Sequence, residues 1–190
     1  MNYIGFNQAV ADGIQMDNWE PLKAWTLSES SFSYNYGSEA EEVFDEGVFQ
    51  DILLLLKQQD FLDAKGSFHV LRIIEYDWSL LTTRQKAELL IPLQVGYSLF
   101  KSPMSWFIIA EILGEFYADV NSFRVLQELK KISKDGPRSL LPMAFYQIIQ
   151  NCQDGSLSQE AYKELKSMSD DPTRDIKNEA EALLRRQRVL

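Results

Sequence analysis

The sequence predicts an all-α fold: a short α-solenoid of about four helical hairpins, preceded by an irregular or hairpin-containing N-terminal arm. Three prolines, Pro103, Pro137 and Pro172, are separated by 34 and 35 residues, and each begins an apolar helical run. Proline suits the first position of a helix because its missing N–H would be unpaired there. A spacing of this length is typical of stacked helix pairs. The alternative, a compact helical bundle, requires no matched proline spacing.

The composition is that of an ordinary globular protein. The chain has 190 residues, of which 45% are hydrophobic and 25% are charged. We therefore expect a single domain over residues 1–190, with the arm at 1–37 and the helical repeats at 38–190. No apolar stretch is long enough for a membrane span, no basic residue precedes Lys23 as a signal peptide would require, and the lone Cys152 excludes an internal disulfide. These features predict a cytoplasmic protein that does not bind membranes.

The N-terminal arm, residues 1–37, lacks a sustained helical period. Aromatic and polar residues alternate over 32–36, with the period of two that is typical of a half-buried strand. A small hairpin of strands 23–27 and 31–36 would explain this alternation. An irregular arm lying over the first helices would use the same aromatic residues, so both arrangements remain open.

Two capping boxes mark helix starts ahead of the three prolines. These boxes are Ser38–Glu41 and Thr82–Gln85. In each, the hydroxyl of the first residue can accept the backbone N–H three residues later, while the Glu or Gln side chain accepts the backbone N–H of the first residue. Gly47 weakens the first helix by about 1 kcal/mol relative to alanine. Pro92 should kink the helix that follows Thr82, because it has no N–H for the carbonyl four residues back.

The remaining helices are bounded by polar capping residues. Ser102 and Asp171 can cap the helices that begin at the prolines after them, and Ser156 or Ser158 can cap the seventh helix. The expected hairpins are 39–63 with 67–78, 83–100 with 103–118, 121–133 with 137–152, and 158–168 with 172–188. One face of the three proline-led helices should be buried, through Phe107, Ile108, Leu113, Leu141, Ala144, Ile148, Ile176, Ala180 and Leu183.

The run from Asp170 to Leu184 resembles the second helix of a HEAT repeat, with its leading Asp-Pro and with small residues where neighbouring helices touch. The resemblance extends over residues 83–190. It implies a HEAT-like α-solenoid, an architecture whose extended faces bind other proteins.

The chain offers no recognisable catalytic constellation. Its one histidine, His69, and its one cysteine, Cys152, are too far apart in the sequence for a metal motif. Carboxylate pairs occur without a histidine or an oxyanion loop, and the early glycines are isolated rather than grouped in a phosphate-binding loop. We therefore expect no enzyme activity, no metal and no cofactor; an enzyme whose residues follow an unfamiliar pattern is the alternative.

The negative charge is concentrated at the N-terminal end. The net charge is −9, and residues 1–56 hold ten acids against Lys23 alone, whereas the remaining residues hold 18 acids and 18 bases. A negative field repels nucleic acid and attracts basic proteins. We therefore expect a basic protein partner and no nucleic-acid binding, although the acidity could also serve solubility alone.

Size, acidity and architecture make the chain similar to immunity proteins of bacterial toxin systems, including contact-dependent inhibition, some of which are HEAT-like. This resemblance implies a protein that binds and neutralises a cognate toxin, such as a basic nuclease, by blocking its active site with carboxylates and aromatic residues. An adaptor or scaffold of a larger complex is the alternative, and the aromatic residues could instead pack the arm onto the first helices. The predicted partner-binding residues are Glu39, Glu41, Glu42, Asp45, Glu46, Trp19, Trp25, Tyr34 and Tyr36.

Overall fold

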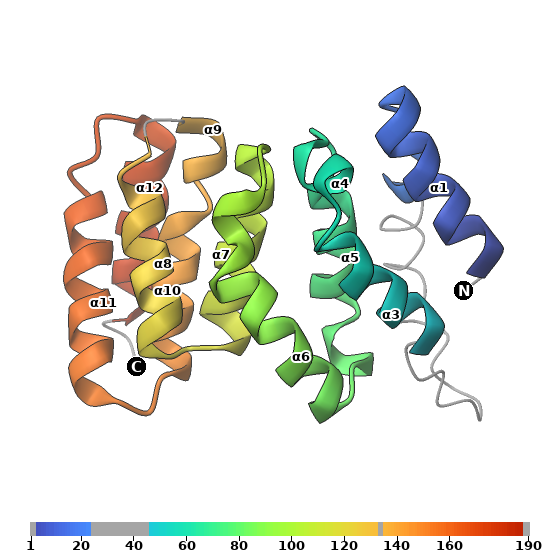
Figure 1. Ribbon diagram of the computed structural model, residues 1–190. Coiled ribbons are helices and arrows are strands. Elements are labelled where there is room, and N and C mark those ends of the chain that lie inside the picture. Colours follow the sequence, from blue (N-terminus) through green and yellow to red (C-terminus); the bar gives the residue numbers. More distant parts are fainter. Residues whose placement is uncertain (1–2, 24–45, 133–134, 188–190) are drawn as a thin grey trace, which may run out of the picture. The chain divides into compact units, whose positions relative to one another are not determined.

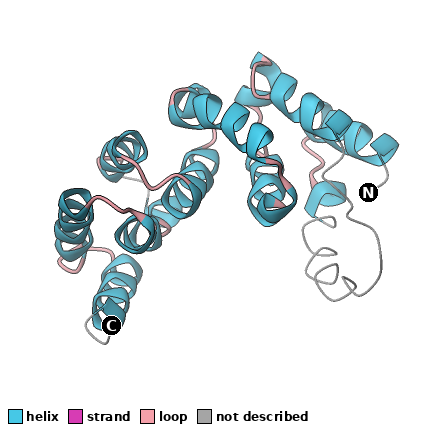
Figure 2. Ribbon diagram, turned by 90° about the horizontal axis from the view of Figure 1, so that it is seen from below, coloured by secondary structure: helices cyan, strands magenta, loops and turns pink. Residues whose placement is uncertain are grey.

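The computed structural model describes residues 3–23, 46–132 and 135–187 (Figure 1). Helix accounts for 80% of these residues, which contain eleven α-helices with defined bounds and no strand. Short loops join the helices (Figure 2). The predicted all-α class is therefore confirmed. The predicted hairpin falls outside the described residues, except for Lys23, which is helical.

The chain forms two compact units, Met1–Ser105 and Trp106–Leu190. We call them unit 1 and unit 2 and describe each by itself.

Unit 1 begins with helix α1 (Tyr3–Met16), within the segment that was predicted to lack a helix. This part of the arm prediction is wrong. Phe6, Ala9, Val10 and Gly13 are buried, and their spacing of three and four residues places them on one helical face. The helical signal was present, but two of its four positions are the small residues alanine and glycine, which contribute little to an apolar pattern.

The predicted helices 39–63 and 83–100 are each interrupted in the structure. The first is divided, over its described part, between α3 (Glu46–Leu55) and α4 (Gln59–Asp63). The second is α6 (Thr83–Gln94) followed by the short 3-10 helix η3 (Gly96–Leu99). Pro92 cannot donate a backbone hydrogen bond, and α6 ends two residues after it.

Between these segments lie α5 (Phe68–Tyr76) and the 3-10 helix η2 (Trp78–Leu80), close to the predicted helix 67–78. The capping box at Thr82–Gln85 is confirmed: the backbone N–H of Gln85 donates to Thr82 Oγ1 at 3.2 Å, and the N–H of Thr82 donates to Gln85 Oε1 at 2.8 Å. This box fixes the first turn of α6.

Three side-chain contacts of unit 1 recur at the same separation along the chain. Arg84 pairs with Glu46, Ser105 with Ser67 and Lys101 with Asp63, and each pair is 38 residues apart. The segment 46–67 therefore lies alongside the segment 84–105 in one register, with α3 and α6 running in the same direction.

Unit 2 contains most of α7 (Pro103–Phe116) and five further helices: α8 (Val120–Lys130), α9 (Asp135–Arg138), α10 (Leu141–Asn151), α11 (Gly155–Met168) and α12 (Arg174–Gln187). Helix α7 begins at Pro103 as predicted. Pro137 falls in the four-residue α9, and the long helix after it begins at Leu141 with Pro142 in its first turn. Helix α12 begins two residues after Pro172.

The cap of α11 differs from the prediction, and α8, for which no cap was predicted, is also capped. Asp154 caps α11, accepting the N–H groups of Ser156 and Leu157 at 2.8 and 3.3 Å, so neither predicted serine is the cap. Asp119 caps α8 through the N–H of Ser122 at 2.8 Å. In both cases the carboxylate stands directly before the helix, where it also complements the helix dipole.

Helix α10 contacts both α7 and α12 in unit 2. A Cβ on Gly114 of α7 would lie 2.6 Å from the carbonyl oxygen of Ala144 of α10, and Gln150 of α10 donates to Gln187 of α12. The side chain of Glu115 accepts a bond from Gln147, and its carbonyl oxygen accepts one from Asn151, so the C-terminal end of α7 lies against α10. All nine residues predicted to be buried on these helices are fully buried, which confirms the predicted core.

Candidate functional site

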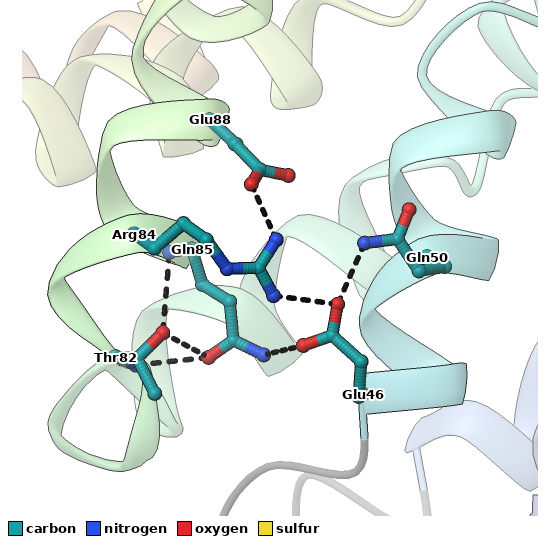
Figure 3. A network of polar contacts seen from close by, with 6 residues as sticks. All are labelled: Glu46, Gln50, Thr82, Arg84, Gln85 and Glu88. Carbon is teal, nitrogen blue, oxygen red and sulfur yellow. Dashed lines mark hydrogen bonds and ion pairs between the residues drawn. The ribbon is translucent and has the colours of Figure 1, made fainter.

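A polar network on the surface of unit 1 joins α3 to α6 (Figure 3). At its centre is the carboxylate of Glu46, the first residue of α3. Arg84 Nη2 donates to its Oε1 at 2.7 Å, and Gln85 Nε2 donates to its Oε2 at 3.0 Å. The α3–α6 network is defined as Glu46, Gln50, Thr82, Arg84, Gln85 and Glu88.

The capping box orients Gln85 toward Glu46. Gln85 is fully buried, and its Oε1 already accepts bonds from the backbone N–H and the hydroxyl of Thr82. Its Nε2 is thereby directed to the carboxylate. One residue thus serves both to start α6 and to bind α3.

Residues one turn further along each helix complete the network. Gln50 Nε2 donates to Glu46 Oε1 at 2.8 Å, and Arg84 Nη1 donates to Glu88 Oε1 at 2.6 Å. Both pairs have the spacing of four residues that brings helical side chains together. The hydrogen bond from Arg84 and then that from Gln50 lower the pKa of Glu46, and Glu46 in turn raises the pKa of Arg84. The charge of Glu46 is therefore balanced within unit 1.

Seven of the nine predicted partner-binding residues lie outside the described part of the chain: Trp25, Tyr34, Tyr36, Glu39, Glu41, Glu42 and Asp45. Glu46 lies in the α3–α6 network, and Trp19 lies in the core of unit 1. The structure therefore does not bring these two residues together.

Trp19 is only 5% exposed. A Cβ on Gly13 or on Gly66 would lie 2.5 or 2.2 Å from its ring atoms, so both glycines are needed for its close packing. Its Nε1 donates to Asp17 Oδ1 at 3.1 Å, and its ring stacks on His69 with centroids 6.0 Å apart. This placement fits the alternative in which the aromatic residues pack the N-terminal segment onto the helices.

His69 is the buried histidine beside that ring. Burial, assisted by the nearby charge of Lys23 and opposed by Glu20, lowers its pKa to about 4. The imidazole is therefore neutral near pH 7. Within the described residues, no group of three or more His, Cys, Asp and Glu side chains could hold a metal ion, and no helix there is long and apolar enough to cross a membrane.

The exposed apolar residues were not recognised from the sequence. Ile91 of α6 and Val95, the residue that follows this helix, are each 71% exposed, and Leu99 of η3 is 58% exposed. Six of the seven large apolar side chains that are exposed in the described structure belong to unit 1: Met16, Leu54, Tyr76, Ile91, Val95 and Leu99. The spacing of four residues from Ile91 to Leu99 was visible in the sequence, but an apolar stripe is ordinarily assigned to the core.

Comparisons with protein families, with curated proteins and with solved structures found no match to this chain. The described residues form an all-helical protein of two compact units. Six of the seven large apolar side chains that are exposed among these residues belong to unit 1.

Proposed function

We propose that this chain is a HEAT-like helical-repeat protein that binds another protein, and that it acts in the cytoplasm as an immunity protein. Its partner is a cognate bacterial toxin, most simply a basic nuclease, whose active site it blocks. The observation that carries this proposal is the coincidence in unit 1 of strong negative charge and exposed apolar side chains.

The charge distinguishes the two units clearly. Unit 1 holds 15 acids against 7 bases, a net charge of −8, whereas unit 2 holds 13 acids against 12 bases, a net charge of −1. A protein surface that is both acidic and apolar favours a partner that is basic and carries apolar anchors.

The repeated register of inter-helix contacts supports the solenoid architecture. In unit 1 three contacts join residues that are 38 apart, and in unit 2 Arg138 pairs with Asp171 and Lys130 with Glu164 at separations of 33 and 34. Stacked helical repeats produce such nearly constant separations, because each repeat contacts only its neighbours. A compact bundle has no reason to produce them.

The division into two compact units favours a second candidate, an adaptor that holds a separate partner on each unit. The two candidates differ in their effect on the partner. An immunity protein abolishes a toxic activity, whereas an adaptor leaves the activity of its partners intact.

The experiment is capture of partners from a native lysate with the tagged chain, identification by mass spectrometry, and co-expression of the captured protein with this chain. We expect a basic nuclease domain whose expression stops growth, and whose toxicity is suppressed when this chain is present. A captured partner whose activity is unchanged in the complex would exclude inhibition and leave the adaptor.

A further inference from the structure

Helix α6 is apolar on two opposite faces. Leu89 and Leu93 are fully buried in unit 1, whereas Ile91 and Val95 are each 71% exposed. Residues two apart on a helix are separated by about 200° around its axis. The buried leucines already supply the face that a core helix needs, so Ile91 and Val95 form a second apolar face that the described part of unit 1 leaves open.

A further exposed apolar residue follows the end of α6. Leu99 in η3 follows Val95 by four residues and is 58% exposed. We call Ile91, Val95 and Leu99 the α6 row. Val95 directly follows α6, and its N–H donates to the carbonyl oxygen of Ile91 at 2.9 Å, so Ile91 and Val95 are about 6 Å apart along the helix axis.

Paired charges stand at both ends of the α6 row. At the start of α6, Arg84 binds Glu46 and Glu88, and two residues after Leu99, Lys101 binds Asp63 at 2.5 Å. These side chains already have partners within unit 1. A protein that covers the row therefore leaves no buried charge unpaired at its margins, which is the arrangement of an apolar interface with a polar rim.

We propose that the α6 row is the docking surface for an amphipathic helix of a basic protein partner. A helix presents apolar side chains at the same spacing of three and four residues and can interlock with the row. Unit 1 has a net charge of −8, and its described residues alone hold 10 acids against 7 bases. This negative charge favours a helix whose polar positions carry lysine or arginine. This inference rests on the proposed protein-binding function and names the surface and the element that would meet.

The test uses two synthetic 18-residue amphipathic peptides, each with a fluorophore and the same leucine face. One carries lysine and the other glutamate at every polar position. Binding to the full chain is measured by fluorescence anisotropy. We expect the lysine peptide to bind at least tenfold more tightly than the glutamate peptide, and its affinity to fall as salt rises.

The decisive variant is Ile91→Ser/Val95→Ser, with Val120→Ser in unit 2 as the matched control, because Val120 is an apolar side chain that is 50% exposed. We expect the double variant to bind the lysine peptide at least tenfold more weakly and the control to bind it as the wild type does. Equal binding by the double variant would overturn the proposal, and equal affinity for the two peptides would overturn the basic character of the partner.

Two other occupants of the row are separated by measurements on the same proteins. A concentration-dependent dimer of the wild type that the double variant does not form, seen by sedimentation, would assign the row to a second copy and overturn the proposal. A melting temperature lowered by the double variant but not by Val120→Ser would show that the chain itself covers the row, with the same consequence. Toxin suppression tests the proposed function separately, because it can persist after the α6 row is altered.

Discussion

Arg138 and Asp171 form a bidentate ion pair in unit 2, in which Arg138 Nη1 and Nη2 donate to Asp171 Oδ2 and Oδ1 at 2.7 and 3.0 Å. Their side chains are only 12% and 8% exposed. Asp171 Oδ1 also accepts the N–H of Thr173 at 2.9 Å. Because α12 begins only at Arg174, this bond holds the residue before the helix, and Asp171 is not the cap of the first helical turn as predicted. Burial raises the pKa of Asp171, but the bonds from Thr173 and Arg138 outweigh burial and lower it overall.

The first prediction separates the ion pair of Asp171 with Arg138 from the hydrogen bond that Asp171 accepts from Thr173. Asp171→Asn keeps an oxygen for the N–H of Thr173 but removes the charge that faces Arg138. We expect the free energy of unfolding to fall by about 1.5–3 kcal/mol, the range for hydrogen bonds to charged groups. The measurement is urea denaturation at pH 7.

The control for this prediction is Arg185→Met. Arg185 is 72% exposed and lies 3.9 Å from Glu181, so removing its charge should change the stability by less than about 0.5 kcal/mol. In a double-mutant cycle, Arg138→Met and Asp171→Asn should be strongly non-additive. Additive effects would show that Arg138 and Asp171 stabilise unit 2 independently of each other.

The second prediction concerns His69 and pH. Its pKa is about 4 in the folded chain and 6.5 in the reference state, so between these values the unfolded chain binds a proton that the folded chain excludes. Stability should therefore fall as the pH is lowered from 6.5 toward 4, and level off below that range as far as His69 is concerned. His69→Gln should remove this part of the slope in urea denaturation between pH 7 and 5. An unchanged slope would show that the imidazole is protonated equally in both states.

The third prediction concerns the close approach of α7 and α10. Gly114→Ala would place a Cβ 2.6 Å from the carbonyl oxygen of Ala144, and a helix backbone cannot move aside as a flexible side chain can. We expect a loss of about 1–3 kcal/mol in the free energy of unfolding. Gly155→Ala is the matched control in the same unit, since nothing lies within 4 Å of its added Cβ. A neutral Gly114→Ala would mean that α7 and α10 are not in contact there.

The sequence predicted the features that depend on neighbours in the chain. The capping box at Thr82–Gln85 and the start of α7 at Pro103 are encoded within a few residues, and both were found. The core of α7, α10 and α12 followed from helical period alone. The interruption at Leu56–Gln58 was missed, because no local residue forbids a helix from continuing there. Pro92 predicted a kink in the later helix, and α6 ends two residues after it.

Features that depend on distant residues were not predictable in the same way. The burial of Trp19 depends on Gly66 and His69, about fifty positions away, and no pattern near Trp19 reveals them. The charge of Glu46 is balanced by Arg84, which is also distant in the sequence. The exposure of Ile91 and Val95 depends on how the whole unit packs. The exposed apolar residues of the candidate surface were therefore not predicted, and the predicted acidic residues other than Glu46 lie outside the described part of the chain.

The last prediction follows from the charge of unit 1 under the proposed function. Glu42→Lys/Asp45→Lys changes the net charge of unit 1 from −8 to −4, and should slow association with a basic toxin domain and flatten its salt dependence. Stopped-flow association at several salt concentrations measures both effects. Glu160→Lys/Asp170→Lys makes the same change in unit 2, where both side chains are exposed, and should slow association less. Equal slowing by the two double variants would show that the toxin responds to the total charge of the chain, and that unit 1 has no special place in its capture.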